Sequence, residues 1–141
     1  MVAYSFKSQF VVPIDLGEKQ QTLRNKGKKR HALPGDTIQH YTGDRFHPRK
    51  FGEATCQEAG EITLDFRRNR VVYTTARGGV RILEKADDLA AFAKLDGFPS
   101  WADLRAFWAV THKGQDVWTG VRIFWGDTFR AGVTAAKEGA A

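Results

Sequence analysis

"GEKQQTLRNKGKKRHALPGD", residues 17–36, joins a short extended segment to a strongly basic one. In the first half, the alternation of a β-strand would place Gln20, Thr22 and Arg24 on one face. The second half is predicted to be a loop, because it combines a glycine, a Pro-Gly turn and a dense run of cations. The segment therefore predicts a strand that runs directly into a basic loop.

The composition indicates a folded domain with an anionic partner. The 141 residues are 42% hydrophobic and 12% aromatic, which is typical of one globular domain with its own core. The net charge of +6 and the pI near 9.7 favour nucleic acid, a nucleotide or a lipid surface. The N-terminus has no signal-like apolar segment, and we expect no membrane partner. A single cysteine, Cys56, cannot form an internal disulfide, which favours a cytoplasmic location.

Residue patterns predict several short strands and two longer helices. Alternating or β-branched segments predict strands at 5–14, 37–43, 51–60, 61–66, 71–76, 79–83 and 116–126, and helical periodicity predicts helices at 85–97 and 98–114. These elements predict an α+β fold, a small β-barrel or strongly bent sheet with two or three packed helices. We expect one domain over residues 1–130 and a flexible C-terminal tail over residues 131–141.

The two predicted helices carry recognisable end signals and apolar stripes. Gly97 suits the C-terminal cap of the first helix, and Ser100 with Asp103 resembles a capping box at the start of the second. Several aromatic residues fall at the spacing of a buried helix face and are predicted to pack in the core: Phe92, Phe98, Phe107 and Trp108.

A cluster of cations surrounds the predicted loop. Residues 17–50 contain three acidic side chains and nine basic ones: Lys19, Arg24, Lys26, Lys28, Lys29, Arg30, Arg45, Arg49 and Lys50. Mutual repulsion makes such a cluster unfavourable for folding, and bound phosphates would relieve it. We therefore predict a surface that binds nucleic acid or nucleotides, with Tyr41 near it for base stacking. The alternative is a solvated loop that only keeps the protein soluble.

The sequence lacks the common metal, cofactor and catalytic motifs. The four histidines match no zinc spacing, and one cysteine offers no thiolate partner. A Gly-rich phosphate loop, a nucleophile elbow and an HExxH element are all missing. No metal and no cofactor are expected.

The segment Lys19-x-x-Thr22-x-Arg24 offers a possible reactive set. A threonine hydroxyl needs a base before it can attack a substrate, and a lysine is such a base when burial and nearby cations depress its pKa. Arg24 could supply that field, or hold a phosphate or carbonyl group. On the residues alone, an ordinary strand with a solvated threonine and solvated cations explains the pattern equally well.

In its order of segments the chain resembles the ASCH domain, a branch of the PUA-like β-barrel superfamily. GEKQQTLR (17–24), the basic loop, PGD (34–36), a strand and GEATC (52–56) follow one another as in that family. LDGFPSWADLRAFW (95–108) is similar to its turn into a helix, and GVRIFWG (120–126) to its closing strand. The resemblance spans roughly residues 5–125 and is of a type common in phage and prophage proteins.

The resemblance implies a cleft that binds RNA, single-stranded nucleic acid, nucleotides or nucleosides. It implies that Gly17, Arg24, Lys26, Lys28, Lys29, Arg30, Tyr41, Arg45 and Arg49 contribute to binding. Some members are metal-independent amidohydrolases that deacylate N-acetylated cytidine, and others are described as ribonucleases. The amidohydrolase set, a lysine, a threonine and a distant glutamate, falls on Lys19, Thr22 and Asp96. Asp96 departs from the family glutamate by one methylene, a deficit of about 1 Å that can cost about 100-fold in rate.

Overall fold

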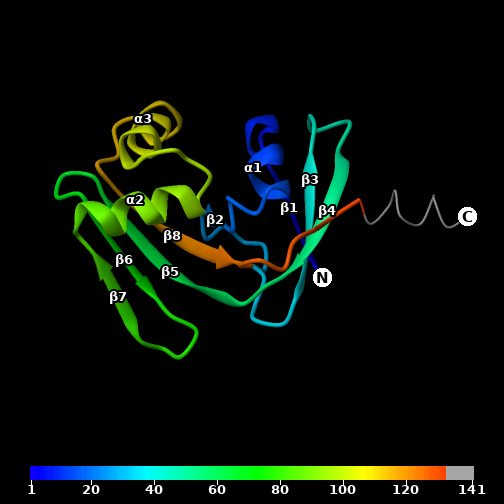
Figure 1. Ribbon diagram of the computed structural model, residues 1–141, viewed down its shortest axis with the longest axis horizontal. Helices are drawn as coiled ribbons and strands as arrows, with labels where there is room; N and C mark the ends of the chain where they lie inside the picture. Colours follow the sequence, from blue (N-terminus) through cyan, green and yellow to red (C-terminus); the bar gives the residue numbers. More distant parts are fainter. Residues whose placement is uncertain (133–141) are drawn as a thin grey trace, which may run out of the picture.

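A computed structural model describes residues 1–132 as an α+β fold. Its elements, labelled in Figure 1, follow one another as β1 (Val2–Ser5), η1 (Ser8–Phe10), α1 (Val11–Asp15), β2 (Gln21–Arg24), β3 (Thr37–Thr42), β4 (Arg49–Thr55), β5 (Glu58–Asp65), β6 (Arg70–Thr74), β7 (Val80–Leu83), α2 (Ala86–Leu95), α3 (Trp101–Thr111), β8 (Val117–Phe124) and β9 (Arg130–Ala131). The predicted α+β class is confirmed.

The strands form two sheets. A four-stranded sheet has the order β1-β3-β4-β9, and a five-stranded sheet has the order β2-β8-β5-β6-β7. Only β1 and β3 are parallel; the other pairs are antiparallel. Hydrogen bonds do not close these described strands into one barrel, because β2 and β7 remain the two edges of the larger sheet. In Figure 1, α2 crosses the five-stranded sheet, and β3 and β4 stand on the far side of α1.

Two of the predicted strands are wrong in part. Residues 5–14 were expected to be one strand, but the chain leaves β1 at Ser5 and turns through η1 into α1. Pro13 is tolerated in the first turn of a helix, where its missing N–H leaves no bond unmade. Residues 51–60 divide into β4 and β5, since Cys56 N donates to Asp36 O and Gln57 N donates to Phe124 O. These two bonds mark the point at which the chain passes from the four-stranded sheet to the five-stranded sheet.

The predicted helices are confirmed, with their end signals. Ser100 Oγ accepts a hydrogen bond from Asp103 N at 3.1 Å, so the serine is the N-cap of α3. Gly97 follows α2 with φ +94°, a conformation that suits glycine. The remaining strand predictions correspond to β3, β5, β6, β7 and β8.

The core is apolar and rich in aromatic rings. Ile14, Ile38, Ile62, Leu64 and Leu104 are completely buried, and so is Trp125 beside Phe6. No helix in residues 1–132 has the length and apolar character that a membrane span requires. Of the predicted tail, Ala131 lies in β9 and pairs with Gly52, while residues 133–141 lie outside the described part of the chain.

Candidate functional site

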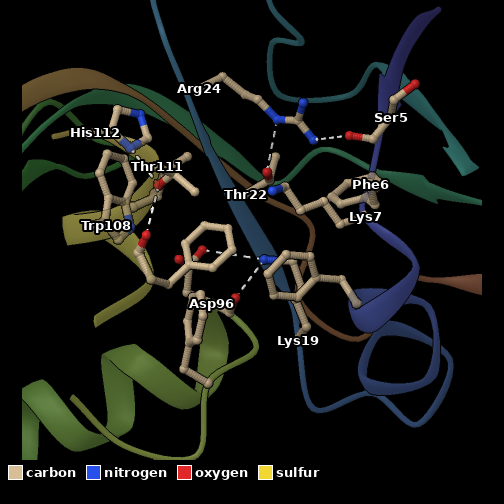
Figure 2. Close-up of a pocket in the computed structure, with 14 residues that line it drawn as sticks. Ser5, Phe6, Lys7, Lys19, Thr22, Arg24, Asp96, Trp108, Thr111 and His112 are labelled. Atoms are coloured by element: carbon tan, nitrogen blue, oxygen red, sulfur yellow. Dashed lines mark hydrogen bonds and ion pairs between the residues drawn. The ribbon is translucent and has the colours of Figure 1, made fainter. Parts of the chain in front are cut away.

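A cavity of about 470 Å³ opens between β2, α3 and the first turns of the chain. Figure 2 shows Lys19, Thr22 and Arg24 along its β2 side, with Trp108, Thr111 and His112 across from them on the α3 side. The aromatic side chains of its wall come from four segments of the chain. They are Phe6, Phe10, Phe98, Phe107 and Trp108. The volume falls in the range of small-molecule sites.

Local backbone contacts bring β2 against the end of α2. Gly17, at φ +79°, turns the chain after α1, and Lys19 N donates to Pro13 O at 3.0 Å. Gln20 N then donates to Leu95 O at 2.8 Å. Because this bond holds Gln20 against the end of α2, the neighbouring Lys19 lies beside Asp96, the C-cap residue of that helix. Strand alternation directs Thr22 and Arg24 to the cavity as well.

Lys19 and Asp96 form a buried pair, although 77 residues separate them. The Lys19 Nζ donates to Asp96 O at 2.6 Å and lies 3.4 Å from Asp96 Oδ1. The ammonium also lies 4.7 Å from the centre of the Phe10 ring. The side chains are only 4% and 7% exposed, so little solvent screens their charges. The Asp96 carbonyl is among the last of α2, which is where a cation is favoured.

Burial drives both groups toward their neutral forms. Desolvation lowers the pKa of Lys19 below its ordinary value, and Asp96 only partly opposes that shift. Desolvation likewise raises the pKa of Asp96, against the opposing effect of Lys19. A lysine with a lowered pKa beside an aspartate with a raised pKa, both in one cavity, is typical of sites that bind or transfer protons.

Arg24 organises the polar side of the cavity. Its Nε donates to Thr22 Oγ1 at 3.0 Å, and its Nη2 donates to Ser5 O at 2.7 Å. The guanidinium stacks over the ring of Tyr4, in β1, and over the ring of Phe6, which follows β1. With its oxygen accepting from Arg24, the Thr22 hydroxyl keeps its own hydrogen for another acceptor.

Three aromatic residues predicted to be core side chains also line the cavity. Phe98, Phe107 and Trp108 pack on the core and present part of their surface to the hollow. Thr111 and His112, which were not among the predicted site residues, also line it. The His112 ring stacks on Trp108 with centroids 4.0 Å apart, and Thr111 Oγ1 lies 2.8 Å from its Nδ1. The signal for them was the Trp-x-x-Thr-His spacing at the end of α3.

The basic loop borders a second hollow of about 610 Å³ beside β1. Lys26, Lys28, Lys29 and Arg30 line it, and Arg24 lines both this hollow and the cavity. Two of the loop cations have acidic partners: Lys26 pairs with Glu61 and Arg30 pairs with Asp36. The predicted loop residues therefore lie next to the predicted reactive residues.

The predicted binding residue Gly17 lines neither the cavity nor the second hollow, and three further predicted binding residues lie elsewhere. Tyr41 is in β3, Arg45 is in the turn after it, and Arg49 begins β4; none of them lines the cavity or the second hollow. Arg45 stacks on the exposed ring of Phe46 instead. The structure does not bring these three residues to the site.

Three polar side chains form a hydrogen-bonded network next to the site. Glu58 accepts from Arg122 Nη1 at 2.7 Å, and Arg122 Nε donates to Gln21 Oε1 at 2.8 Å. This bond fixes the orientation of the buried Gln21 amide. Gln21 Nε2 is buried without a hydrogen-bond partner among the described residues. Sequence patterns did not indicate this network, because its three residues lie on strands that are far apart in the sequence.

Gly97 permits the close approach of Asp96 to Lys19. A Cβ on Gly97 would lie 2.8 Å from Lys19 Cδ and 3.0 Å from Phe10 Cδ1, at a φ that already strains other residues. We expect Gly97→Ala to lower the free energy of unfolding by about 1–3 kcal/mol, measured by urea denaturation. Gly78→Ala is the matched control, since its φ is +80° with no atom within 4 Å. Equal losses in the two variants would contradict a tight contact at Gly97.

The described residues contain no group of three or more histidine, cysteine, aspartate or glutamate side chains placed to hold a metal ion.

Comparison with known proteins identified no relative of this chain. No family model, no curated protein and no solved structure matches the chain.

Proposed function

We propose that the cavity binds a nucleobase and that the neighbouring basic loop binds the attached phosphates, as in an RNA- or nucleotide-binding protein. The observation that carries the proposal is the pairing, in one cavity, of an aromatic wall with a buried row of polar groups. Unpaired bases are held by stacking on aromatic rings and by hydrogen bonds to their edges. The cavity offers both kinds of contact.

The polar row suits the edge of a heterocycle. Thr22 has a hydroxyl hydrogen to donate, and Lys19 has a third N–H beyond the two directed at Asp96. The carboxyl of Asp96 accepts when ionised and donates when protonated. Such fixed and mixed donors and acceptors match the carbonyl and amino groups of a base.

We also propose that the chain is an ASCH-domain protein of the PUA-like superfamily. The support is the order of its sequence segments, together with the proximity of Lys19, Thr22, Arg24 and Asp96 around one cavity. Under this proposal the two sheets correspond to an opened form of the family's β-barrel.

The binding proposal is tested with single-stranded RNA at several salt concentrations. We expect binding at low salt that weakens as salt rises, with a log–log slope of about −0.7 for each phosphate contact. Thr22→Val removes a buried hydroxyl at nearly constant volume and should weaken binding about 10-fold or more. Thr63→Val is the control, because Thr63 is a strand threonine that does not line the cavity. Absence of binding at low salt would refute the proposal.

A second candidate function is the hydrolysis of an N-acylated cytosine nucleoside. The specific observation in its favour is the Lys19–Asp96 pair, whose pKa values burial moves toward neutrality beside Thr22. Water would replace the amide nitrogen on the acyl carbon, releasing acetate and cytidine. Lys19 would act as the base, Thr22 as nucleophile or water-positioning group, and Asp96 as the proton relay.

Turnover of N-acetylcytidine, followed as the appearance of cytidine, tests this candidate. We expect Lys19→Ala to abolish turnover while Arg77→Ala, in the exposed β6–β7 hairpin, retains it. Turnover that survives Lys19→Ala would remove Lys19 from the mechanism. If the wild-type protein releases no cytidine, the hydrolase candidate fails and the binding proposal is unaffected.

A further inference from the structure

Three hollows adjoin one another around two consecutive residues, Arg24 and Asn25. Arg24 lines the aromatic cavity and the basic hollow. Asn25 lines the basic hollow and a third, polar hollow of about 490 Å³. His112 lines both the polar hollow and the cavity. The three hollows therefore share wall residues and lie next to one another.

The residues at these shared walls are held in place. Asn25 Oδ1 accepts from the indole nitrogen of Trp118 at 3.0 Å, and Trp118 is buried. His112 is stacked on Trp108, and Arg24 is bonded to Thr22 and Ser5. A ligand that spans the hollows would meet fixed groups at each junction, which limits the ordering cost of binding.

We propose that the ligand is a single-stranded oligonucleotide of at least about three nucleotides, bound more tightly than a single nucleoside or a duplex. The inference rests on the proposed function and names its substrate class. One base enters the aromatic cavity, and its phosphodiester lies at Arg24. The strand continues on one side over the basic hollow and on the other over the polar hollow, beside the Trp108–His112 stack.

The charges of the basic hollow favour a strand over a small ligand. Lys28 and Lys29 are exposed and form no salt bridge within residues 1–132, whereas Lys26 and Arg30 have acidic partners. Neither Lys28 nor Lys29 lines the cavity, so the base of a nucleoside held there would not touch them. Phosphates of neighbouring nucleotides would reach them and release counterions.

The depth of the cavity favours a single strand over a duplex. Its floor is formed by the buried groups of Lys19, Thr22 and Asp96. A base inside a duplex cannot reach such a floor without leaving its stack, which costs a few kcal/mol. An unpaired strand avoids that cost.

The test is a length series measured with the intact chain. The probes are homopolymeric single strands of each base, from one to about eight nucleotides, at low salt. We expect affinity to rise steeply up to about three or four nucleotides and only slowly beyond. Lys28→Ala/Lys29→Ala should lower affinity for the longer strands about 10-fold and reduce their salt slope by about 1.4, with mononucleotide binding unchanged.

The matched control is Arg77→Ala/Arg81→Ala, which removes two exposed cations from the β6–β7 hairpin, at the sheet edge opposite β2. We expect this variant to bind like the wild type. Mononucleotide binding with no gain in longer strands would overturn the inference and leave the proposed function standing. A length gain that persists in the Lys28/Lys29 variant, or equal affinity for a duplex, would also overturn it. Failure of every probe to bind would refute the proposed function itself.

Discussion

Asp96→Ala is expected to lower the free energy of unfolding by about 3–5 kcal/mol. The variant leaves Lys19 buried beside the apolar Phe10 ring without its carboxyl partner. An ammonium that keeps only the backbone carbonyl of residue 96 as a partner must lose its proton or draw in water, and both responses destabilise the fold. Thermal or urea unfolding, with ligand affinity measured in parallel, gives the size of the loss.

A double-mutant cycle separates the pair from the packing around it. Lys19→Met/Asp96→Ala removes both charges, so we expect it to lose less stability than Asp96→Ala alone. Glu61→Ala breaks the exposed Lys26–Glu61 pair, whose side chains are 66% and 55% exposed, and should cost no more than about 1 kcal/mol. A double variant as unstable as the sum of the two single variants would contradict a coupled pair.

His40 is expected to make the protein sensitive to mild acid. Its ring is completely buried, stacked on Phe6 and in edge contact with Trp125, and its Nε2 has no hydrogen-bond partner among the described residues. Burial lowers the pKa of His40 from 6.5 to about 4, and the nearby charges of Lys19 and Arg24 add to that shift. The folded state therefore binds this proton more weakly than the unfolded state.

Acid therefore destabilises the folded state relative to the unfolded state. Stability is fully present above pH 6.5 and is lost as the pH falls through 6.5 toward about 4, by about 3 kcal/mol in total. The measurement is urea denaturation of the wild type and His40→Phe across this range. We expect the stability difference between them to change in favour of His40→Phe as the pH falls. Parallel curves would contradict a buried, neutral histidine.

The parts of the structure that sequence reasoning predicted are those set by local signals. Ser100 and Gly97 define helix ends by their own side chain or backbone preference, and α2 and α3 begin and end accordingly. The segment from Lys19 to Arg24 was selected as one group of candidate site residues from the sequence. Its members lie close together in the chain, and four of them (Lys19, Thr22, Leu23 and Arg24) line the cavity with Asp96.

The parts that were missed depend on contacts between distant segments. Phe107 and Trp108 have the spacing of core residues, and periodicity cannot tell a ring that is covered from one that faces a hollow. The hydrogen-bonded network of Glu58, Arg122 and Gln21 forms only when β2, β5 and β8 pair. No local sequence pattern specifies that pairing. The strand predicted at residues 5–14 was wrong in its second half, where α1 directs Ile14 into the core.

Ultraviolet cross-linking of bound single-stranded RNA, followed by mass spectrometry of the linked peptides, tests the central claim most directly. A base held in the cavity lies against the aromatic wall, so we expect cross-links on Phe98, Phe107, Trp108 or His112. Thr22→Val should reduce these links while Thr63→Val does not. Cross-links confined to the β6–β7 hairpin or to Phe46, with none on the cavity wall, would contradict a nucleobase in this cavity.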